Sequence, residues 1–300
     1  MSGAVEQPAI AIVVPVRNAS ELLADCLGPI RDQLSPRDEL VVVDDASADG
    51  SGDVAERLGA RVVRRASPGG PYAARNDGWA ATDHPYVLFT DVRCVPQPGW
   101  VARVRDAAAD GCDLIFSDII VRGGARLAER VAEHRQHLLA RHYAEHPYFL
   151  PYFPTANLAV KRAALEAIDG FRVMPSGGDA DFCWRVQLAG FNNVCAIGEP
   201  LMEWRPRATV PALLEQWAKY GRSNAVLRYA YADRGAPIEP ALHPLHAIAR
   251  HARRTTRRLA RERNGGGPAI TLLDGCVDLV HELSYGHTAR RLRRHKSDNA

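Results

Sequence analysis

The segment YVLFTDVRCVPQPGW, from Tyr86 to Trp100, places a carboxylate at the end of an apolar run. The aromatic and β-branched residues of Tyr86–Phe89 favour a buried strand, and Asp91 stands at its end. This position is typical of a ligand site, because ligands of α/β sheets bind beside the carboxyl ends of the strands. Arg93 follows two positions later, where a site that handles phosphates and metals more often carries a second acid.

Similar apolar, β-branched runs recur along the N-terminal part of the chain, at Ile10–Val16, Leu40–Val43, Ala60–Val63 and Asp113–Phe116. Helix-like segments such as SELLADCLGPIRDQL and GDVAERLG lie between most of them. This alternation predicts an α/β fold with a mostly parallel central sheet flanked by helices. Polar loops follow three early strands, with the sequences PVRNAS, DDASADGS and TDVRC, and we expect them to converge on one crevice.

The remainder of the chain is predicted to be mainly helical. Apolar residues at helical spacing indicate helices at Arg126–His146, in KRAALEAIDGF up to Gly170, in SGGDADFCWRVQLAGF and at Val210–Tyr231. The segment LHPLHAIARHARRTTRRLARER predicts one amphipathic helix with a side made of Arg250, Arg253, Arg254, Arg257, Arg258 and Arg261. Gly265–Pro268 predicts a break before a last helix, which precedes a second basic cluster, ARRLRRHK.

The composition describes an ordinary globular chain of 300 residues, with 46% hydrophobic and 24% charged residues. Its six cysteines stand far apart without a CxxC pair, so we expect reduced thiols, a cytoplasmic setting and no zinc site. The apolar start at Ile10–Val16 lacks the basic leader of a signal peptide. No run approaches the roughly 18–20 apolar residues that a membrane-spanning helix needs.

The net charge of +3 hides an uneven distribution of charge. Residues 241–300 hold 12 basic and 5 acidic side chains, whereas the other 240 residues hold 26 basic and 30 acidic ones. The basic tail has three interpretations: a solvated or homo-oligomeric face, contact with anionic lipid at the cytoplasmic face of a membrane, or nucleic-acid binding. The first is favoured because the stripe lacks Trp and Phe, and nucleic acid ranks last because no nucleic-acid motif accompanies it.

Six sequence blocks between Ile10 and Arg222 resemble the inverting family 2 glycosyltransferases, in the order found in that family. They are PVRNASELLADCL, VVVDDASADGS, PYAARNDGWAATDHPYVLFTDVRCVPQPGWV, FPTANLAVKRAALEAIDGF, GGDADFCWRVQLAGF and EWRPRATVPALLEQWAKYGRS. The resemblance implies a GT-A fold, a nucleotide-diphosphate sugar donor, an acceptor of the hydroxyl type and hexosyltransferase-like activity. It implies a transferase domain at 1–235, with a nucleotide-binding half at about 1–125 and an acceptor-binding half at about 126–235, before a basic helical extension at 236–300.

The resemblance also implies which residues contact the donor. It assigns the nucleotide side of the site to Pro15, Arg17, Asn18, Asp44, Asp45, Arg75, Asn76 and Asp91. Asp45, with Asp44 as a second candidate, matches the acid that recognises the base, since a carboxylate can accept a nucleobase N–H. The alternative for these acids is a turn role, because Asp, Ser and Gly form turns by themselves. The alternative for Asn76 is a hydrogen bond to the backbone that anchors the strand-to-helix connection.

Two departures from the family pattern weaken the expectation of a metal. Asp91 matches the first acid of the family's DxD-type motif, but Val92 and Arg93 occupy the next two positions. Trp204, in WRPR, stands where many members carry a histidine that completes the metal site. Mg²⁺ and Mn²⁺ prefer several oxygen or nitrogen ligands. A metal therefore remains a possible cofactor through Asp91, without a predicted set of ligands.

The family's catalytic base aligns with Asp179 in GGDADFCWR, where Gly178 replaces the usual Glu. An alternative for Asp179 is a helix N-cap without a catalytic role. We expect Asp181 to have a supporting or capping role, Arg185 to pair with it or with another acid nearby, and Trp184 to lie in the core.

Arg93 suggests a hypothesis for the leaving group. A guanidinium suits phosphate oxygens, so Arg93, with Arg205 or Arg207, could stabilise the departing diphosphate in place of a metal. The rival interpretation is a catalytically impaired relative that still binds a nucleotide sugar. A dinucleotide-binding oxidoreductase is disfavoured because the first loop, PVRNAS, lacks the GxGxxG pattern.

Overall fold

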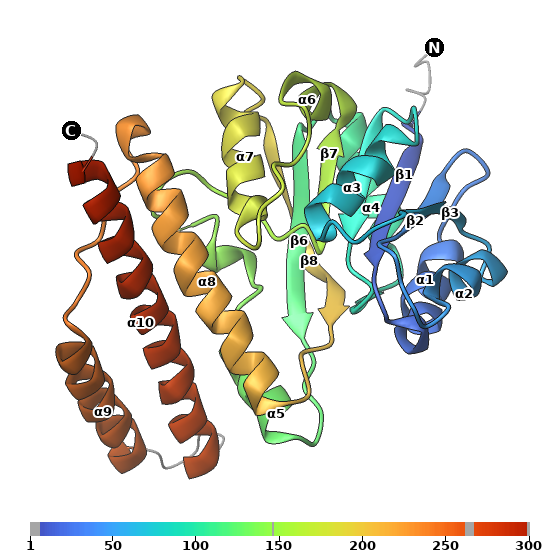
Figure 1. Cartoon of the computed structure of the whole chain (residues 1–300). Helices are drawn as coiled ribbons and strands as arrows, with labels where there is room; N and C mark the ends of the chain where they lie inside the picture. The colour runs from blue at the N-terminus through green and yellow to red at the C-terminus, as the bar shows by residue number, and fades with distance from the viewer. Residues whose placement is uncertain (1–6, 146, 262–266, 299–300) are drawn as a thin grey trace. The chain divides into compact units, whose positions relative to one another are not determined.

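A mixed sheet of eight strands forms the centre of the described structure. The computed structural model describes residues 7–145, 147–261 and 267–298. Its strands are β1 (Ile10–Val16), β2 (Glu39–Asp44), β3 (Arg61–Arg64), β4 (Tyr86–Thr90), β5 (Cys94–Pro96), β6 (Leu114–Val121), β7 (Asn157–Lys161) and β8 (Val194–Trp204). They follow the order β3-β2-β1-β4-β7-β6-β8-β5 (Figure 1).

The strands β3, β2, β1 and β4 are parallel, as their apolar runs predicted. Their shared register places Val13 beside Val41 on one side and Phe89 on the other. Beyond β4 the sheet changes direction, because β7 runs antiparallel to both β4 and β6 and β5 runs antiparallel to β8. The expected parallel sheet is therefore confirmed for the N-terminal half, while the C-terminal half makes the sheet mixed.

Six helices of the described residues accompany this sheet. They are α1 (Leu23–Arg31), α2 (Ser51–Arg57), α3 (Pro71–Ala80), α4 (Trp100–Ala109), α6 (Arg162–Ala167) and α7 (Gly178–Leu188). Right-handed crossovers place α1 and α2 on one face of the parallel strands and α3 on the other, because the chain reverses its direction across the sheet after β3. Gly78 brings α3 close to β1, since a Cβ there would lie 2.4 Å from Cγ1 of Val13.

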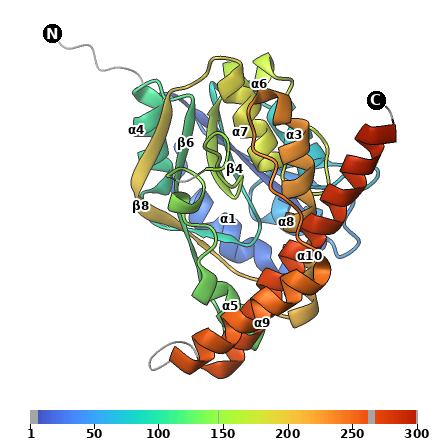
Figure 2. The same ribbon diagram turned by 90° about the vertical axis from the view of Figure 1, so that its left-hand side faces the viewer.

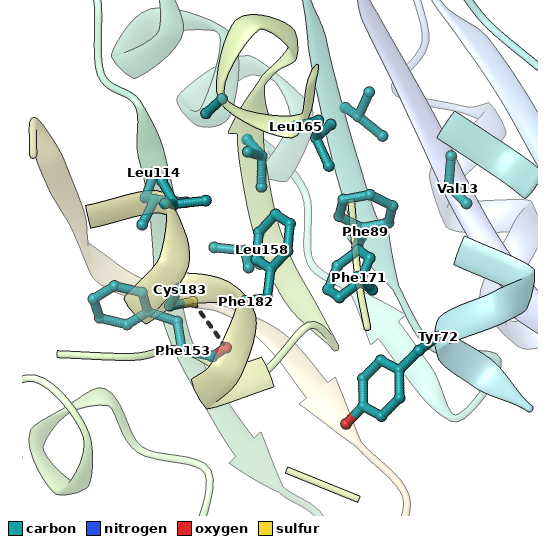
Figure 3. Packing of buried hydrophobic residues seen from close by; sticks show 14 of the residues in the cluster. Val13, Tyr72, Phe89, Leu114, Phe153, Leu158, Leu165, Phe171, Phe182 and Cys183 are labelled. Carbon is teal, nitrogen blue, oxygen red and sulfur yellow. Dashed lines mark hydrogen bonds between the residues drawn. The ribbon is translucent and has the colours of Figure 1, made fainter. Parts of the chain in front are cut away.

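A buried aromatic cluster joins the sheet to α3 and α7 (Figure 3). Phe171 stacks on Phe182 with ring centroids 4.1 Å apart and meets Phe89 edge to face at 5.2 Å. Tyr72 of α3 stacks on the other side of Phe171 at 5.8 Å. Each fully buried aromatic side chain contributes roughly 1.5–3 kcal/mol to stability. The helices that carry candidate site residues are thus fixed to the sheet by the hydrophobic core.

Four helices form a second compact unit. They are α5 (Leu127–Arg135), α8 (Val210–Ala230), α9 (Pro244–Arg261) and α10 (Pro268–Asp298). Within this unit α10 packs along both α8 and α9. Gly221 of α8 allows the close approach to α10, because a Cβ there would lie 2.1 Å from the carbonyl oxygen of His281.

The contacts divide the chain at positions that differ from the predicted domain boundaries. The first unit comprises Met1–Ile120, Leu138–Met174 and Gly178–Trp204, and the second comprises Val121–His137, Pro175–Gly177 and Arg205–Ala300. The predicted boundary after residue 235 falls inside the second unit, because α8 packs on α10. Among the described helices, none combines the length and apolarity that crossing a bilayer requires.

Two predicted helices have different bounds in the structure. The predicted helix Arg126–His146 ends at Arg135, because Gln136 adopts a left-handed conformation with φ 40°, and a 3₁₀ turn follows at Ala140–His142. His146 lies outside the described residues, as do Gly265 and Gly266 of the predicted break at Gly265–Pro268. The last predicted helix and the second basic cluster form one continuous helix, α10.

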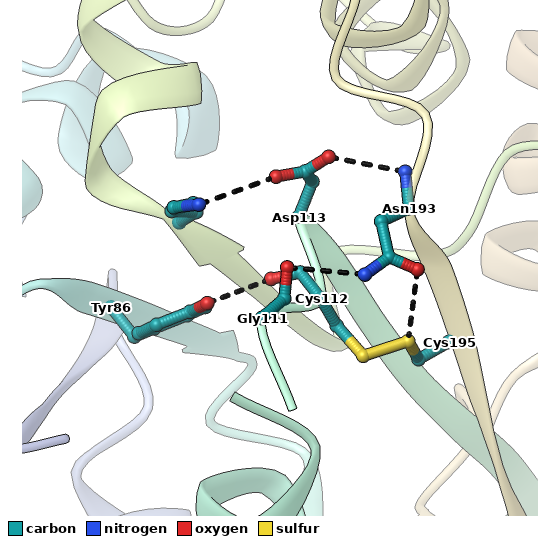
Figure 4. Close-up of a disulfide and its surroundings, with 7 residues drawn as sticks. Tyr86, Gly111, Cys112, Asp113, Asn193 and Cys195 are labelled. Atoms are coloured by element: carbon teal, nitrogen blue, oxygen red, sulfur yellow. Dashed lines mark hydrogen bonds and ion pairs between the residues drawn. A yellow bond between two sulfur atoms is a disulfide. The ribbon is translucent and has the colours of Figure 1, made fainter. Parts of the chain in front are cut away.

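Cys112 and Cys195 form a disulfide, which overturns the expectation that all six thiols are reduced (Figure 4). The two residues are 83 positions apart in sequence, and their Cα atoms are 6.0 Å apart. Cys112 precedes β6 and Cys195 lies in β8, which is the neighbour of β6 in the sheet. The wide spacing concealed the pair because strand order, which the spacing does not show, brings the two residues together.

The disulfide predicts the number of free thiols. Protein that is purified without reductant and then unfolded should expose four thiols to a thiol reagent, from Cys26, Cys94, Cys183 and Cys276, and six after reduction. Replacing both Cys112 and Cys195 by Ser should lower the free energy of unfolding by about 2–4 kcal/mol, since the bridge restricts the unfolded chain. Cys276→Ser, at an exposed free cysteine, is the control and should leave stability unchanged. Six thiols before reduction would contradict the disulfide.

Candidate active site

Asp179 occupies the first turn of α7, where two side chains from other segments hold its carboxylate. Oδ1 of Asp179 accepts hydrogen bonds from Oη of Tyr72 at 3.0 Å and from Oγ1 of Thr155 at 3.1 Å. Both bonds end on the same oxygen, so Oδ2 has no protein donor among the described residues. The carboxylate is therefore oriented by α3 and by the segment before β7, with one oxygen left to act on a ligand.

Gly178 is coupled to the same tyrosine. Its backbone N–H donates to Oη of Tyr72 at 3.0 Å. A Cβ on Gly178 would lie 2.6 Å from Cζ of Tyr72, closer than real side-chain contacts. The tyrosine ring thus occupies the space that a side chain at position 178 would need. This packing explains why glycine stands where the family pattern has a glutamate.

The surroundings of Asp179 control its ionisation. Burial raises the pKa of the Asp179 carboxyl, and the negative charge of Asp91 raises it further. The positive charge of Arg75 and the hydrogen bonds from Tyr72 and Thr155 oppose this rise, but the net shift of the pKa is upward. A carboxylate with a raised pKa is a better general base near neutral pH than an ordinary one.

Asp91 and Arg75 form an ion pair in which Arg75 is buried and Asp91 is partly exposed. Asp91 follows β4 directly, and its Oδ1 accepts a hydrogen bond from Nη2 of Arg75 on α3. Arg75 is only 3% exposed, and its guanidinium lies 5.5 Å from the ring centroid of Tyr72. Asp91, Arg75, Tyr72, Thr155 and Asp179 form one connected set, which we call the carboxylate network. It brings together three residues that the sequence predicted separately.

The carboxylates of Asp44 and Asp45, at the end of β2, accept hydrogen bonds from backbone N–H groups of their own chain. Asp45 is buried, and its two carboxylate oxygens accept the backbone N–H groups of Gly69 and Gly70 at 2.7 and 2.9 Å. Arg65 adds an ion pair at 3.0 Å. Oδ1 of Asp44 accepts the N–H of Ser47 at 2.9 Å. Asp44 therefore has the turn role that was the alternative to nucleotide binding. Asp45 anchors the loop that leads into α3. Contact of either acid with a nucleobase stays a prediction.

The loop after β1 is hydrogen-bonded to the loop after β2, as the predicted crevice requires. Pro15 lies buried in β1, and Arg17 is exposed just beyond it. Asn18 joins the two loops, because its N–H donates to Oγ of Ser47 at 3.0 Å and its Oδ1 accepts the N–H of Ala48 at 2.8 Å. The convergence of these two loops is confirmed.

Asn76 anchors the backbone of a distant segment. Its Nδ2 donates to the carbonyl oxygen of Phe171 at 2.7 Å, and its Oδ1 accepts the N–H of Phe171 at 2.8 Å. Both ends of the side-chain amide are thus used by one residue. Asn76 thus anchors backbone, but that backbone lies in the segment after α6 and not in the predicted strand-to-helix connection; a role in nucleotide contact stays a prediction.

The supporting residues of α7 behave as expected. Asp181 is buried and pairs with Arg185 at 2.9 Å, while Arg172 adds a second ion pair at 3.1 Å. Trp184 is fully buried, and its Nε1 donates to the carbonyl oxygen of Leu150 at 2.7 Å. These contacts confirm the pairing of Asp181 with Arg185 and the core position of Trp184.

The remaining candidates lie at the strand ends and in the second unit. Arg93 is half-buried in the turn between β4 and β5. Trp204 is buried at the end of β8, where it is paired with Cys94 of β5. Arg205 and Arg207 belong to the second unit, so their part in the site stays a prediction.

Sequence reasoning missed Tyr72 and Thr155. Tyr72 lies one helical turn before Arg75 in PYAARNDG, and Thr155 lies in FPTANLAV, so both belong to the blocks that carry the family resemblance. The hydroxyl groups of these two side chains within those blocks were the available signal. Their contact with Asp179 was not, because Tyr72 is 107 residues away from it in sequence.

The residues present do not fit an ordinary divalent-metal site. Asp91 is paired with Arg75, and its neighbours Val92 and Arg93 bring no oxygen ligand from their side chains. Trp204 offers an indole, which is not a metal ligand. Across the residues that the structure describes, no three His, Cys, Asp or Glu side chains are grouped to hold a metal ion. Asp91 is the one side-chain oxygen ligand that positions 91–93 and 204 offer, so a divalent cation bound here would take its remaining ligands from the donor diphosphate and water.

Solved structures share the fold of this chain at low sequence identity. A mannosyltransferase from Pyrobaculum calidifontis, in complex with GDP-Man and Mn²⁺, has a TM-score of 0.58 at 20% identity, over 93% of this chain and 87% of that one. Glucosyl-3-phosphoglycerate synthase from Mycobacterium tuberculosis, in complex with Mn²⁺ and UDP, has a TM-score of 0.55 at 22% identity, over 78% and 82%. Both matches support the GT-A fold.

Sequence comparison identifies the family. A pre-mycofactocin glycosyltransferase of Mycobacterium tuberculosis is 28% identical over 249 residues, which are 76% of this chain and 49% of the relative. This chain thus spans about half the length of that relative. The family model described as "Glycosyl transferase family 2" matches residues 11–174, which is more than half of the chain. The match includes β1, β2, β4 and the residues Arg75 and Asp91, and the chain therefore belongs to glycosyltransferase family 2.

Proposed function

We propose that the chain transfers a sugar from a nucleotide-diphosphate donor to an acceptor hydroxyl, with inversion and with Asp179 as the general base. The observation that carries this proposal is the Asp179 carboxylate, which is oriented through Oδ1 by Tyr72 and Thr155 and has Oδ2 available. The family, and the GDP-Man and UDP bound in structural neighbours, support this class of donor.

The proposed reaction is a single displacement. Oδ2 of Asp179 takes the proton of the acceptor hydroxyl as the acceptor oxygen forms a bond to the anomeric carbon. The bond from that carbon to the diphosphate oxygen breaks at the same time, and the diphosphate leaves with the electron pair. Attack from the face opposite the leaving group inverts the configuration, and an oriented base lowers the cost of aligning the reactants.

Cationic side chains are proposed to stabilise the leaving diphosphate. Arg75 pairs with Asp91 at the end of β4, and Arg93, in the turn that follows, carries another permanent positive charge. A guanidinium can donate two parallel hydrogen bonds to phosphate oxygens. Arg205 and Arg207 are further candidates. Charge stabilisation of this kind is commonly the largest single catalytic contribution.

The rival proposal, a catalytically impaired relative, loses part of its basis. It relied on two departures from the family pattern, at Gly178 and at Val92–Arg93. The first has a packing cause, because the Tyr72 ring fills the space beside Gly178 while its hydroxyl orients Asp179. Glycine at position 178 is thus compatible with an oriented Asp179, and we do not take it as evidence of lost catalysis.

Replacing the proposed base should abolish turnover while donor binding is retained. A thermal-shift screen first identifies the nucleotide sugar that stabilises the wild-type protein. Asp179→Asn should then lower kcat for transfer, or for slow hydrolysis of that donor, by about 10²–10⁴-fold, because the amide cannot accept the proton. Its donor-induced shift in Tm should persist. Asp110→Asn, at an exposed position, serves as the control; near-normal turnover by Asp179→Asn would rule out this base.

Removing the tyrosine hydroxyl should move the pH profile. The base must be ionised to act, so activity falls as the pH drops through the pKa of Asp179, which burial has raised. The hydrogen bond from Tyr72 lowers this pKa. Tyr72→Phe should therefore shift the acidic limb of the kcat profile to higher pH. Tyr86→Phe removes another tyrosine hydroxyl, bonded 2.8 Å from the carbonyl oxygen of Cys112, and should leave the limb in place. An unchanged limb in Tyr72→Phe would count against the proposal.

Turnover should survive removal of divalent metal. The purified protein should keep its activity in excess EDTA, because the ligand set around Asp91 does not suit a divalent cation. Arg93→Ala should lower kcat by about 10²–10³-fold, and Arg93→Lys by less, because lysine keeps the charge but loses the planar fork. Arg57→Ala, at an exposed arginine, is the matched control. Complete loss in EDTA that Mg²⁺ or Mn²⁺ restores would show that the cation is required.

A further inference from the structure

Gly177 lies two residues before the proposed base and packs on helix α8. A Cβ at this position would lie 2.9 Å from Cδ1 of Leu227 and 3.0 Å from Cβ of Ser223. The φ angle of Gly177 is +80°, in the left-handed region that glycine adopts readily and other L-residues rarely adopt. The lack of space and the backbone conformation therefore both require glycine at position 177.

The surface of α8 under Gly177 is held in place by a second helix. Leu227 and Ser223 are both buried. Helix α10 runs alongside α8 in both views of the chain (Figure 1, Figure 2). Asn224 of α8 and His281 of α10 are joined by a hydrogen bond of 3.1 Å between Nδ2 and Nε2. A segment that packs on this surface of α8 thus has a defined position.

The residue after Gly177 belongs to the surroundings of the base. The division between the two compact units falls between Gly177 and Gly178, which one peptide bond joins. The N–H of Gly178 lies in the plane of that peptide bond, so the backbone of Gly177 sets where it points. This N–H donates to Oη of Tyr72 at 3.0 Å, and Oη of Tyr72 donates to Oδ1 of Asp179 at 3.0 Å. A displacement at Gly177 therefore reaches the base through two consecutive hydrogen bonds.

These two hydrogen bonds reinforce each other. A hydroxyl that accepts a hydrogen bond becomes a stronger donor, because each bond polarises the next. Tyr72 is buried, and the low dielectric constant of its surroundings strengthens both bonds. The bond from Tyr72 lowers the pKa of Asp179 against the larger rise that burial causes. Loss of the Gly178 N–H therefore weakens the stabilisation of the ionised base.

We propose that Gly177 is a positioning residue for the transfer reaction, because its packing on Ser223 and Leu227 fixes the peptide plane that presents the Gly178 N–H to Tyr72. Residues of α8 thereby influence the orientation of the base, although none of them belongs to the carboxylate network. This inference rests on the proposed role of Asp179 as the general base.

Gly177→Ala tests the inference on the full chain. The added methyl group and the left-handed alanine should displace the Gly178 N–H, so kcat should fall by about tenfold or more, since small misplacements near a catalytic group have effects of this order. The acidic limb of the kcat profile should move to higher pH, because the pKa of Asp179 rises when Tyr72 donates less strongly. The donor-induced shift in Tm should persist.

Gly190→Ala is the matched control. Gly190 follows the other end of α7 and has a φ angle of +98°. Apart from its chain neighbours, no atom of the described residues lies within 4 Å of a Cβ at this position. The variant therefore has a similar backbone strain without the close contact. It should lower Tm while kcat and the acidic limb stay close to those of the wild type.

Leu227→Ala disturbs the same contact from α8 and provides the test if Gly177→Ala does not fold. It removes a side chain on which Gly177 packs, so kcat should fall and the acidic limb should again move to higher pH. Leu213→Ala, at another buried leucine of α8, should lower Tm and leave the limb in place. In the double variant, Leu227→Ala makes room for the methyl group of Gly177→Ala. Its kcat should therefore exceed the value that multiplying the two single effects predicts.

Tyr72→Phe identifies the route of the effect. The acidic limb has already moved in this variant, so adding Gly177→Ala should move it no further, because the effect of Gly177 on the limb passes through the tyrosine hydroxyl.

Three results would overturn the inference and leave the proposed function standing, provided that Asp179→Asn is inactive. One is a Gly177→Ala variant that matches Gly190→Ala in kcat and in the position of the limb. Another is a limb that moves as far in Leu213→Ala as in Leu227→Ala. The third is a further shift of the limb when Gly177→Ala is added to Tyr72→Phe. Near-normal turnover by Asp179→Asn would instead remove the proposed base, and this inference with it.

Discussion

The buried guanidinium of Arg75 is the constraint on which the site depends. A charge that is only 3% exposed is tolerated when it is paired, and Asp91 provides the pair at the end of β4. That pairing fixes α3 relative to the sheet, in agreement with the close contact of Gly78 with Val13. Tyr72, one turn earlier on α3, is thereby placed to hold both Gly178 and Asp179 of α7. One ion pair thus connects the end of β4, through α3, to the proposed base Asp179.

The departures from the family pattern have a common physical basis in this network. The ring of Tyr72 fills the space that a side chain at position 178 would need, and its hydroxyl donates to the carboxylate of Asp179. Beside Asp91, Val92 and Arg93 stand where the family pattern has a further acid. The first change exchanges a neighbouring acid for a phenol. The proposed metal-independent transfer would exchange a divalent cation for the guanidinium group of Arg93.

The two units use charge differently. In the first unit two arginines of the site have little exposure and are paired with acids, Arg75 with Asp91 and Arg185 with Asp181. In the second unit α10 supplies Glu282 and Asp274 to one side of α9 and leaves the other side positive. The basic excess of residues 241–300 therefore reaches the surface as an organised strip.

The sequence by itself determined the local structure: the parallel strands β1 to β4, most of the helices, and contacts between near neighbours such as Asp181 with Arg185. Such features depend on apolar periodicity and on spacing within one or two helical turns, and both can be read from consecutive residues. The tertiary structure alone decided the pairing of Cys112 with Cys195, the antiparallel direction of β7, the packing of α8 on α10 and the contact of Tyr72 with Asp179. A residue's character shows that it is buried or polar, but its partner is chosen by strand order and helix packing across many intervening residues.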